Sequence, residues 1–378
     1  MYLLRILRRS EGTINRESLS LPETHSNTFS LSWLSKNLAI FQNYTQFYSA
    51  VLAVPLNLFL IFLILKNSPK ELGAYKYLMI YISVFDVVYA IMDVVVSPFA
   101  HSYGSTFLVI VNMRTAWLSK TVLSVLLSVY CGFYGCSMAI FGIHFVYRYF
   151  VASGSKLLKT FNSWKLVVWF SIPILIGVTW SLLTYWPCMR REATDRYVEK
   201  NIMETFGLGL SEIEYISPYF YELKGNRTND LKIYWPSFIG IGINSCIINA
   251  SISSIVYFGY KCYKKLKLLV PAGRTSKRNR VLQNQLFMAL VTQTLIPVFL
   301  MHIPVSVLYF CSFMSVELGS ATGIAPVTIA LFPALDPLPT VLIIKSYRVA
   351  VGRYLLWIPR KICCVCKPKK KPVDVVST

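Results

Sequence analysis

Acidic residues are scarce in this sequence: its 378 residues include 17 aspartate and glutamate residues against 38 lysine and arginine residues, a formal net charge of +21. Charged residues make up only 15% of the chain, whereas 55% of it is hydrophobic. A mean hydropathy of +0.52 is too apolar for a soluble domain with a wetted surface. The basic residues punctuate apolar runs instead of sharing one face with aromatic residues, which argues against a nucleic-acid partner. We therefore predict an integral membrane protein.

Histidine is also rare, and cysteine lacks the spacing of a metal site or a disulfide framework. The four histidines are scattered over an N-terminal tail, a loop and two helix depths, so they do not form the ligand cluster that a metal-dependent membrane hydrolase needs. We predict neither enzyme activity nor a cofactor or metal. Several of the nine cysteines lie within apolar runs, where they are expected to act as small hydrophobic residues. These are Cys131, Cys136, Cys246 and Cys311.

The N-terminus lacks an apolar run long enough for a signal peptide, so the first spanning helix is expected to act as the insertion signal. Residues 1–46 are polar and are predicted to form an extracellular tail. Seven later runs are each long enough to cross about 30 Å of hydrocarbon and predict an all-α, seven-transmembrane helix bundle over residues 47–345. We find no internal repeat, which argues against an inverted-repeat transporter. The predicted spans are residues 47–65, 78–100, 121–147, 166–186, 233–260, 285–313 and 322–344.

The distribution of basic residues predicts the orientation. Most lysine and arginine residues fall in segments that are cytoplasmic if the N-terminus is outside and the C-terminus is inside. Two glycosylation acceptor sequences, at Asn43 and Asn226, then lie on the external side, which agrees with this assignment. The short loop 261–280 is strongly basic and suits an acidic partner or anionic lipid.

Three polar residues are predicted at one depth in the membrane. Asn57, Asp86 and Asp336 each lie nine or ten residues from a basic residue that marks the cytoplasmic edge, on the order of 14 Å at 1.5 Å per residue. Two carboxylates at one depth cannot both stay ionised in a low-dielectric interior without a cation, a shared proton or water. The shared depth favours one polar switch cluster. The alternative is that each acid has separate hydrogen-bond partners.

Prolines predict where two of the spans bend. Pro333 and Pro337 flank Asp336, so backbone hydrogen bonds are missing beside a buried acid. Pro297 and Pro304 lie seven residues apart in the sixth span and predict a helix that bends at two points. We interpret both pairs as hinges, with a tolerated kink as the alternative.

Further polar side chains are candidates for a ligand pocket or for partner binding. The ligand-pocket candidates lie in the outer halves of the second, third and sixth spans, where a hydrogen-bonded packing role is the alternative. They are Tyr89, Asp93, Tyr130 and His302. At the inner end of the third span, Tyr147 and Arg148 are candidates for contact with a cytoplasmic partner protein. Alternatively, an arginine there can simply extend to the membrane interface.

The C-terminal segment, residues 346–378, is predicted to contain a short helix in the membrane interface followed by a basic tail. Three cysteines beside a lysine run are candidates for lipidation, because an acyl chain and a basic patch together give stable anchoring. A reduced, unmodified cluster fits the sequence equally well. The cysteines are Cys363, Cys364 and Cys366.

Three segments resemble the nematode seven-transmembrane chemoreceptors of the serpentine Str class. They are residues 72–102, residues 144–150 (HFVYRYF) and residues 332–348 (FPALDPLPTVLIIKSYR), and the similarity extends over nearly the whole helical body. The sequence departs from rhodopsin-like receptors where Tyr147 replaces the acid before Arg148 and where Thr340 replaces a tyrosine after Asp336.

This resemblance implies a G-protein-coupled olfactory-type receptor in the plasma membrane, in the sensory cilium of chemosensory neurons. Its implied partners are a small-molecule odorant or other chemical cue, a heterotrimeric G protein and membrane lipids. The alternative is a ligand-gated cation channel of the seven-span odorant receptor type. The predicted orientation, with the N-terminus outside, argues against that alternative.

Overall fold

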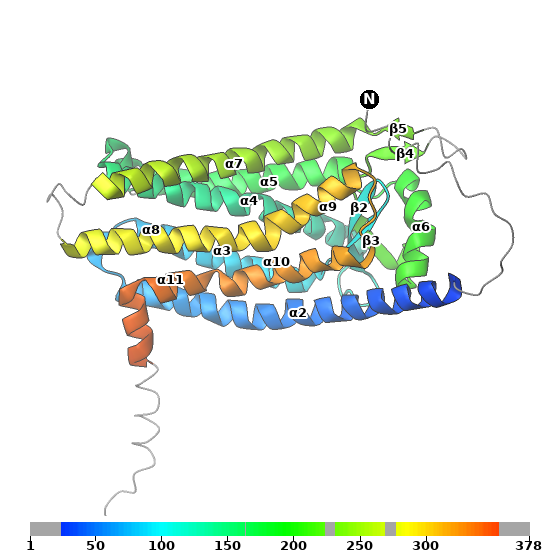
Figure 1. The fold of residues 1–378 in the computed structure, drawn as a ribbon, viewed down its shortest axis with the longest axis horizontal. Helices are drawn as coiled ribbons and strands as arrows, with labels where there is room; N and C mark the ends of the chain where they lie inside the picture. Colours follow the sequence, from blue (N-terminus) through cyan, green and yellow to red (C-terminus); the bar gives the residue numbers. More distant parts are fainter. Residues whose placement is uncertain (1–23, 163, 224–230, 269–276, 355–378) are drawn as a thin grey trace, which may run out of the picture.

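The computed structural model describes residues 24–162, 164–223, 231–268 and 277–354. Seven of its helical segments are long and apolar enough to cross a membrane, which confirms the predicted seven-helix bundle. They run side by side along the long axis of the molecule (Figure 1). The spans are formed by α2 (Thr24–Asn67), α3 (Tyr75–Val96), α4 (Lys120–Ser153), α5 (Lys165–Cys188), α7 (Trp235–Leu268), α8 to α9 (Lys277–Phe313) and α10 to α11 (Ile324–Ile343).

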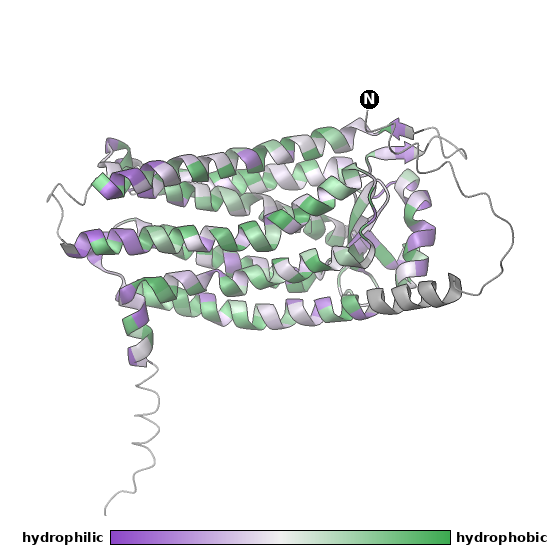
Figure 2. Ribbon diagram, viewed as in Figure 1, coloured by the Kyte–Doolittle hydropathy of each residue, from purple (hydrophilic) through white to green (hydrophobic). Residues whose placement is uncertain are grey.

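Hydrophobic residues cover the helical bodies, whereas hydrophilic residues gather at the helix ends (Figure 2). Two of the spans, α5 and α7, are buried over only 17% of their most apolar stretch, as expected for helices whose sides face lipid. At one end of the bundle lie the short helices η1 (Lys70–Leu72) and η2 (Lys156–Phe161) and many basic residues. We call this the basic end, and we call the opposite end the strand end.

The strand end is covered by a small folded cap that the sequence analysis did not predict. A three-stranded antiparallel sheet has the order β1 (Phe99–Tyr103), β2 (Thr106–Asn112) and β3 (Ile213–Ile216). The amphipathic α6 (Glu192–Phe206) packs Val198 and Ile202 against it. A two-stranded sheet, β4 (Tyr221–Leu223) and β5 (Leu231–Ile233), and the short helices η3 (Leu210–Glu212) and η5 (Gly319–Gly323) complete this end.

Polar contacts stabilise the cap. Arg190 donates to Asp195 at 2.9 Å, and Tyr215 also donates to Asp195 at 2.7 Å. Arg114 forms a bidentate pair with Glu212 and, together with a backbone donor, lowers the pKa of that carboxyl. Burial lowers the pKa of His101, whose ring contacts Asn201. The Arg114–Glu212 and His101–Asn201 contacts tie the segment between α5 and α7 to the β1–β2 hairpin and the loop that follows it.

Several helix ends differ from the predicted boundaries: α4 and α7 continue to Ser153 and Leu268, and α8 begins at Lys277. The first helix begins at Thr24, so the second half of the segment predicted as a tail over residues 1–46 is helical. The second span was predicted to continue to Ala100, but α3 ends at Val96 because Ser97 adopts a left-handed conformation with φ of 45°. The apolar residues that follow form β1 instead of another helical turn. Hydropathy alone does not distinguish the last turn of a helix from a buried strand.

Beyond the seventh span, residues 345–354 form a helix that turns across the axis of the bundle at the basic end (Figure 1). Tyr347 in this helix is fully buried, and its hydroxyl lies 2.8 Å from that of Ser68. The rest of the predicted interfacial helix and the cysteines Cys363, Cys364 and Cys366 lie outside the described residues, as does Asn226.

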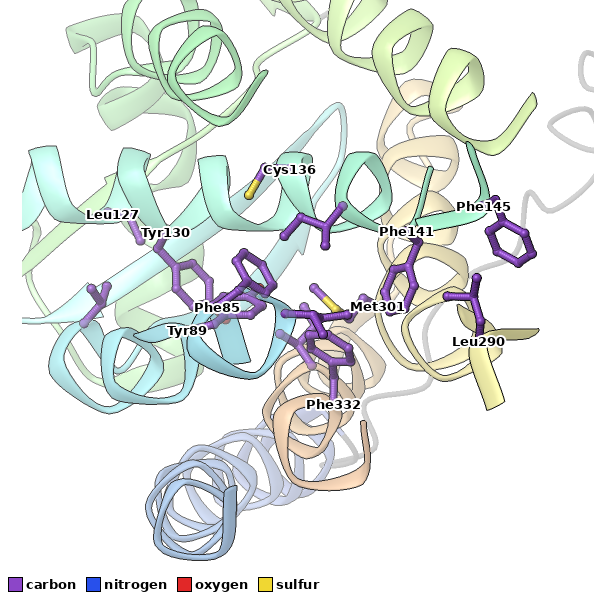
Figure 3. Packing of buried hydrophobic residues seen from close by; sticks show 14 of the residues in the cluster. Phe85, Tyr89, Leu127, Tyr130, Cys136, Phe141, Phe145, Leu290, Met301 and Phe332 are labelled. Carbon is purple, nitrogen blue, oxygen red and sulfur yellow. The ribbon is translucent and has the colours of Figure 1, made fainter. Parts of the chain in front are cut away.

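The main core lies between α3, α4, α8 and α10 (Figure 3). Figure 3 shows Phe85 and Tyr89 of α3 facing Tyr130 of α4, with Phe332 of α10 and Met301 of η4 (Val298–His302) beside them. Close packing of α4 on α5 depends on Gly132, because a Cβ there would lie 2.6 Å from the carbonyl oxygen of Gly177. This core separates polar groups at mid-depth from a cavity near the strand end.

Candidate functional site

A cavity of about 70 Å³ lies between the helices below the cap. Tyr89 of α3, Tyr130 and Tyr134 of α4, and Tyr309 of α9 (Ile303–Phe313) contribute to its walls. The other lining residues are apolar or are Cys131 and Trp180, and none of the described residues that line it is charged. Such a cavity suits an uncharged molecule that can accept a hydrogen bond from a phenol.

A buried carboxylate, Asp93, binds one of the tyrosine hydroxyls beside the cavity. Tyr130 donates to Asp93 at 2.8 Å, and Gln46 of α2 approaches the same Asp93 oxygen at 3.4 Å. The Tyr89 hydroxyl is buried beside that of Tyr130, yet it makes no hydrogen bond of good geometry with the described residues. Asp93 therefore orients Tyr130 from behind.

Not every predicted pocket residue lines this cavity. Tyr89 and Tyr130 do, whereas Asp93 lies behind Tyr130. His302 packs its ring 4.6 Å from that of Tyr134, and its Nε2 lies 3.2 Å from the Ser137 hydroxyl. It supports the wall without being part of it.

Of the three polar residues predicted at one depth, the structure brings Asp86 and Asp336 together, whereas Asn57 bonds the backbone nearby. Asn57 donates to the carbonyl oxygen of Pro333 at 2.8 Å, which fixes α2 against the turn before Asp336. The carboxyl groups of Asp86 and Asp336 face each other. Both Asp86 oxygens are buried without a donor from the described residues. A shared proton, a cation or water must satisfy this pair.

Two further residues complete this cluster. Gln293 of α8 (Lys277–Pro297) donates to Asp336 at 2.5 Å, and its amide oxygen accepts from Thr340 at 3.3 Å. Asp336 lies at the junction of α10 (Ile324–Leu335) and α11 (Pro337–Ile343), where Pro337 removes a backbone donor. The cluster thus joins four spans at this junction in the seventh.

Arg148, a candidate from the sequence for contact with a cytoplasmic partner, is buried near the basic end. Its side chain is 2% exposed, and its Nη2 donates to the carbonyl oxygen of Gln283 on α8 at 2.8 Å. The guanidinium lies 5.1 Å above the ring of Tyr75, and no acid among the described residues forms a salt bridge with it. Tyr147 stacks on the same Tyr75 ring at 5.3 Å. In this structure the Arg148 guanidinium is therefore held between α8 and the Tyr75 ring.

Residues 42–352 match the family model described as serpentine type 7TM GPCR chemoreceptor Str. The chain is 35% identical over 320 residues to the G-protein coupled receptor str-217 of Caenorhabditis elegans, which covers 84% of this chain and 91% of that protein. It is 31% identical over 296 residues to the serpentine receptor class r-10 of C. elegans, covering 77% and 84%. The chain belongs to the Str family of serpentine chemoreceptors.

The predicted hinges of this Str receptor coincide with places where the helical hydrogen-bond ladder is disturbed. The α-helix of the sixth span ends at Pro297, five residues form the π-helical turn η4, and α9 then begins with Pro304 in its first turn. In the seventh span, Asp336 keeps helical dihedral angles, with φ of −57° and ψ of −40°, but Pro337 beside it has no backbone donor. π-helical turns and prolines both weaken the regular hydrogen-bond ladder, so these are places where a helix can bend.

Some residues of these sites in the Str receptor were not predicted from the sequence. They are Gln293 of the acid cluster, Gln46 beside Asp93, and Tyr134, Trp180 and Tyr309 of the cavity wall. A signal for Gln293 was present, because an amide inside the apolar sixth span needs a polar partner. The aromatic residues gave no such signal, since 15% of the chain is aromatic and most aromatic residues simply pack.

Proposed function

We propose that this Str receptor binds a small molecule in the cavity below the cap and, in response, opens its basic end to activate a heterotrimeric G protein. The observation that supports the proposal is the order of the three sites along shared helices. The cavity, the acid cluster and Arg148 follow one another from the strand end to the basic end.

Two helices connect the cavity to the acid cluster. Tyr89 lies in the cavity wall, and Asp86 precedes it by about one turn of α3. The Tyr89 ring is 6.3 Å from that of Phe332, which in turn precedes Asp336 by about one turn of α10. A ligand that displaces either ring would shift α3 relative to α10 and change the spacing of the two acids.

One helix then connects the acid cluster to the basic end. Gln293 ties α8 to Asp336, and Gln283 of the same helix ties it to Arg148. If the acid pair rearranges, α8 can swing about η4 and release Arg148 from the Gln283 carbonyl. The ligand favours this open state only by the difference between its affinities for the two states.

The proposed orientation places the N-terminus and the cap outside the cell and the basic end in the cytoplasm, in a plasma membrane that belongs to the sensory cilium of a chemosensory neuron. The excess of lysine and arginine at the basic end supports this orientation. The basic segment 261–280, which includes the adjoining ends of α7 and α8, would then meet the G protein and anionic lipids, as would the lipidation candidates and the helix 345–354.

Glycan mapping tests the orientation. Enzymatic deglycosylation should lower the apparent mass, and replacing both Asn43 and Asn226 by glutamine should abolish the shift. Asn43 is exposed in α2, where it accepts a hydrogen bond from Ser97. Addition of a glycan at an acceptor engineered into the basic segment 261–280 would overturn the orientation.

The experiment that tests the function is a compound screen on cells that express the receptor, with calcium and cyclic-nucleotide readouts. We expect an uncharged small molecule to raise a signal that disappears when heterotrimeric G proteins are blocked. Ligand-evoked cation currents that persist during the block would instead establish the channel function.

A further inference from the structure

We infer that the ligand of the cavity enters from the membrane interior, through an opening between α7 and α9, and that it is therefore an uncharged molecule that partitions into lipid. This rests on the proposed function, since it treats the cavity as the ligand site. It adds the chemical class of the ligand and its route.

The cap blocks direct entry from the strand end. Ala100 of β1 and Phe107 and Val109 of β2 form the wall of the cavity on that side. The neighbouring residues Leu108 and Ile110 are fully buried between this hairpin and α6. A ligand arriving from water would have to separate the sheet from the bundle.

A side opening is present instead, as a groove of about 380 Å³ between α7 and α9. Each helix lines it with residues at positions i, i+3, i+4 and i+7, the spacing of one helical face. Three of the residues are small and leave the helices apart: Gly242, Ser245 and Ser306. The full faces are Phe238, Ile241, Gly242 and Ser245 on α7, and Ser306, Tyr309, Phe310 and Phe313 on α9.

Aromatic rings close the groove toward the cap, so it opens sideways to lipid. Phe220 packs 5.1 Å from Phe238 and 6.2 Å from Phe313, and Phe238 lies 5.8 Å from Phe313. Below these rings, Gly242 and Ser306 are exposed at depths where the apolar spans face hydrocarbon. Polar solutes are scarce in that medium.

Tyr309 separates the groove from the cavity and is a wall of both. Its ring contacts Phe107 edge to face at 4.8 Å, so it is held against the cap hairpin. Rotation of this one side chain would join the two spaces. The cavity beyond it is lined by Tyr89 and Tyr130, whose hydroxyl groups can meet an arriving ligand.

A crevice beside α2 also borders the cavity, because both are lined by Ala100. It has a volume of only about 20 Å³, about one water molecule. The groove between α7 and α9 is the wider route. Size and lining together select a ligand of few heavy atoms that is uncharged, largely apolar and able to accept a hydrogen bond.

Cys131 lines the cavity as a free thiol and can report entry without any signalling. The experiment exposes the full-length receptor in lipid nanodiscs to methyl methanethiosulfonate, which is small and uncharged, or to the anionic 2-sulfonatoethyl methanethiosulfonate. The Cys131 thiolate attacks the sulfenyl sulfur, forming a mixed disulfide and releasing methanesulfinate. Peptide mass spectrometry then follows labelling of Cys131 over time.

We expect only the uncharged reagent to label Cys131. Gly242→Phe should slow that labelling by about tenfold or more, which corresponds to a barrier raised by about 1.4 kcal/mol. A Cβ at Gly242 meets nothing within 4 Å, so the variant should fold. Val256→Phe adds bulk to an exposed position of α7 outside the groove and should leave the rate unchanged. Tyr309→Ala should increase the rate.

Equal labelling by both reagents, or an unchanged rate in Gly242→Phe, would overturn lateral entry and favour a path from water. Labelling of Tyr309→Ala that an added Gly242→Phe change does not slow would show that the groove does not lead to the cavity. If labelling behaves as expected but no compound evokes G-protein signalling, the proposed function fails while the entry route stands.

Discussion

Asp86 and Asp336 illustrate what a single residue decides in this molecule. Each is buried at mid-depth, and the two acids share one environment, with Asn57 and Gln293 on either side. The sequence allowed this cluster to be predicted, because the distance of each residue from a basic helix end gives its depth. Gln293 could not be placed in the same way without knowing how α8 is rotated.

We predict that Asp86→Asn and Asp336→Asn each change basal activity or ligand potency, because each alters the shared proton or cation of the pair. The effect of the double variant should fall short of the sum of the single effects, with a coupling of about 1 to 3 kcal/mol. The measurement is a double-mutant cycle on dose–response curves at matched surface expression. Additive effects would mean that the two acids are satisfied independently.

Arg148→Ala should weaken signalling and leave surface expression and ligand binding largely intact. The physical reason is that Arg148 has a neutral carbonyl as its hydrogen-bond acceptor in the closed structure and becomes available to a partner when α8 moves. G-protein activation at matched surface levels provides the measurement. Arg196→Ala, which removes an exposed guanidinium from α6 in the cap, is the matched control. Unchanged coupling in Arg148→Ala would refute this role.

At the scale of elements, the sequence predicted the spanning helices and missed the cap. Long apolar runs identify helices that cross a membrane, but they do not distinguish a helix end from a buried strand, as the Ser97 to Ala100 boundary shows. The sheet and α6 depend on contacts between the β1–β2 hairpin and a segment about a hundred residues later. Local sequence patterns carry little information about such pairing.

The contact between α4 and α5 gives a prediction for stability. Gly132→Ala would place a Cβ 2.6 Å from the backbone oxygen of Gly177, so the two helices must separate. We expect a loss of about 1 to 3 kcal/mol, seen as a lower thermal transition of the purified receptor in nanodiscs.

Gly142→Ala on the same helix serves as the control, because its nearest neighbour is the Ser254 hydroxyl at 3.8 Å, an ordinary contact. That variant should be neutral or slightly stabilising, since alanine favours helix over glycine. Equal transitions in the two variants would contradict the close-packing argument.

For the whole molecule, the proposed mechanism connects a cavity at one end to a buried arginine at the other through α3, α10 and α8. The seven-helix architecture followed from hydropathy, whereas the cavity did not, because it is the space that remains after side chains from several helices and the cap have packed. The central claim is that occupation of this cavity moves α8 away from α4.

The distance between the basic ends of these elements tests that claim most directly. Spin labels at Val281→Cys on α8 and Leu157→Cys in η2 occupy exposed positions, with the reactive native cysteines replaced by serine. The distances are measured by double electron–electron resonance on the receptor in nanodiscs. An activating compound from the screen should increase a longer-distance population, both without and with the G protein. Asp336→Asn should change the size of that population. A distance distribution that stays the same with and without the compound, while the compound still activates the G protein, would contradict the account.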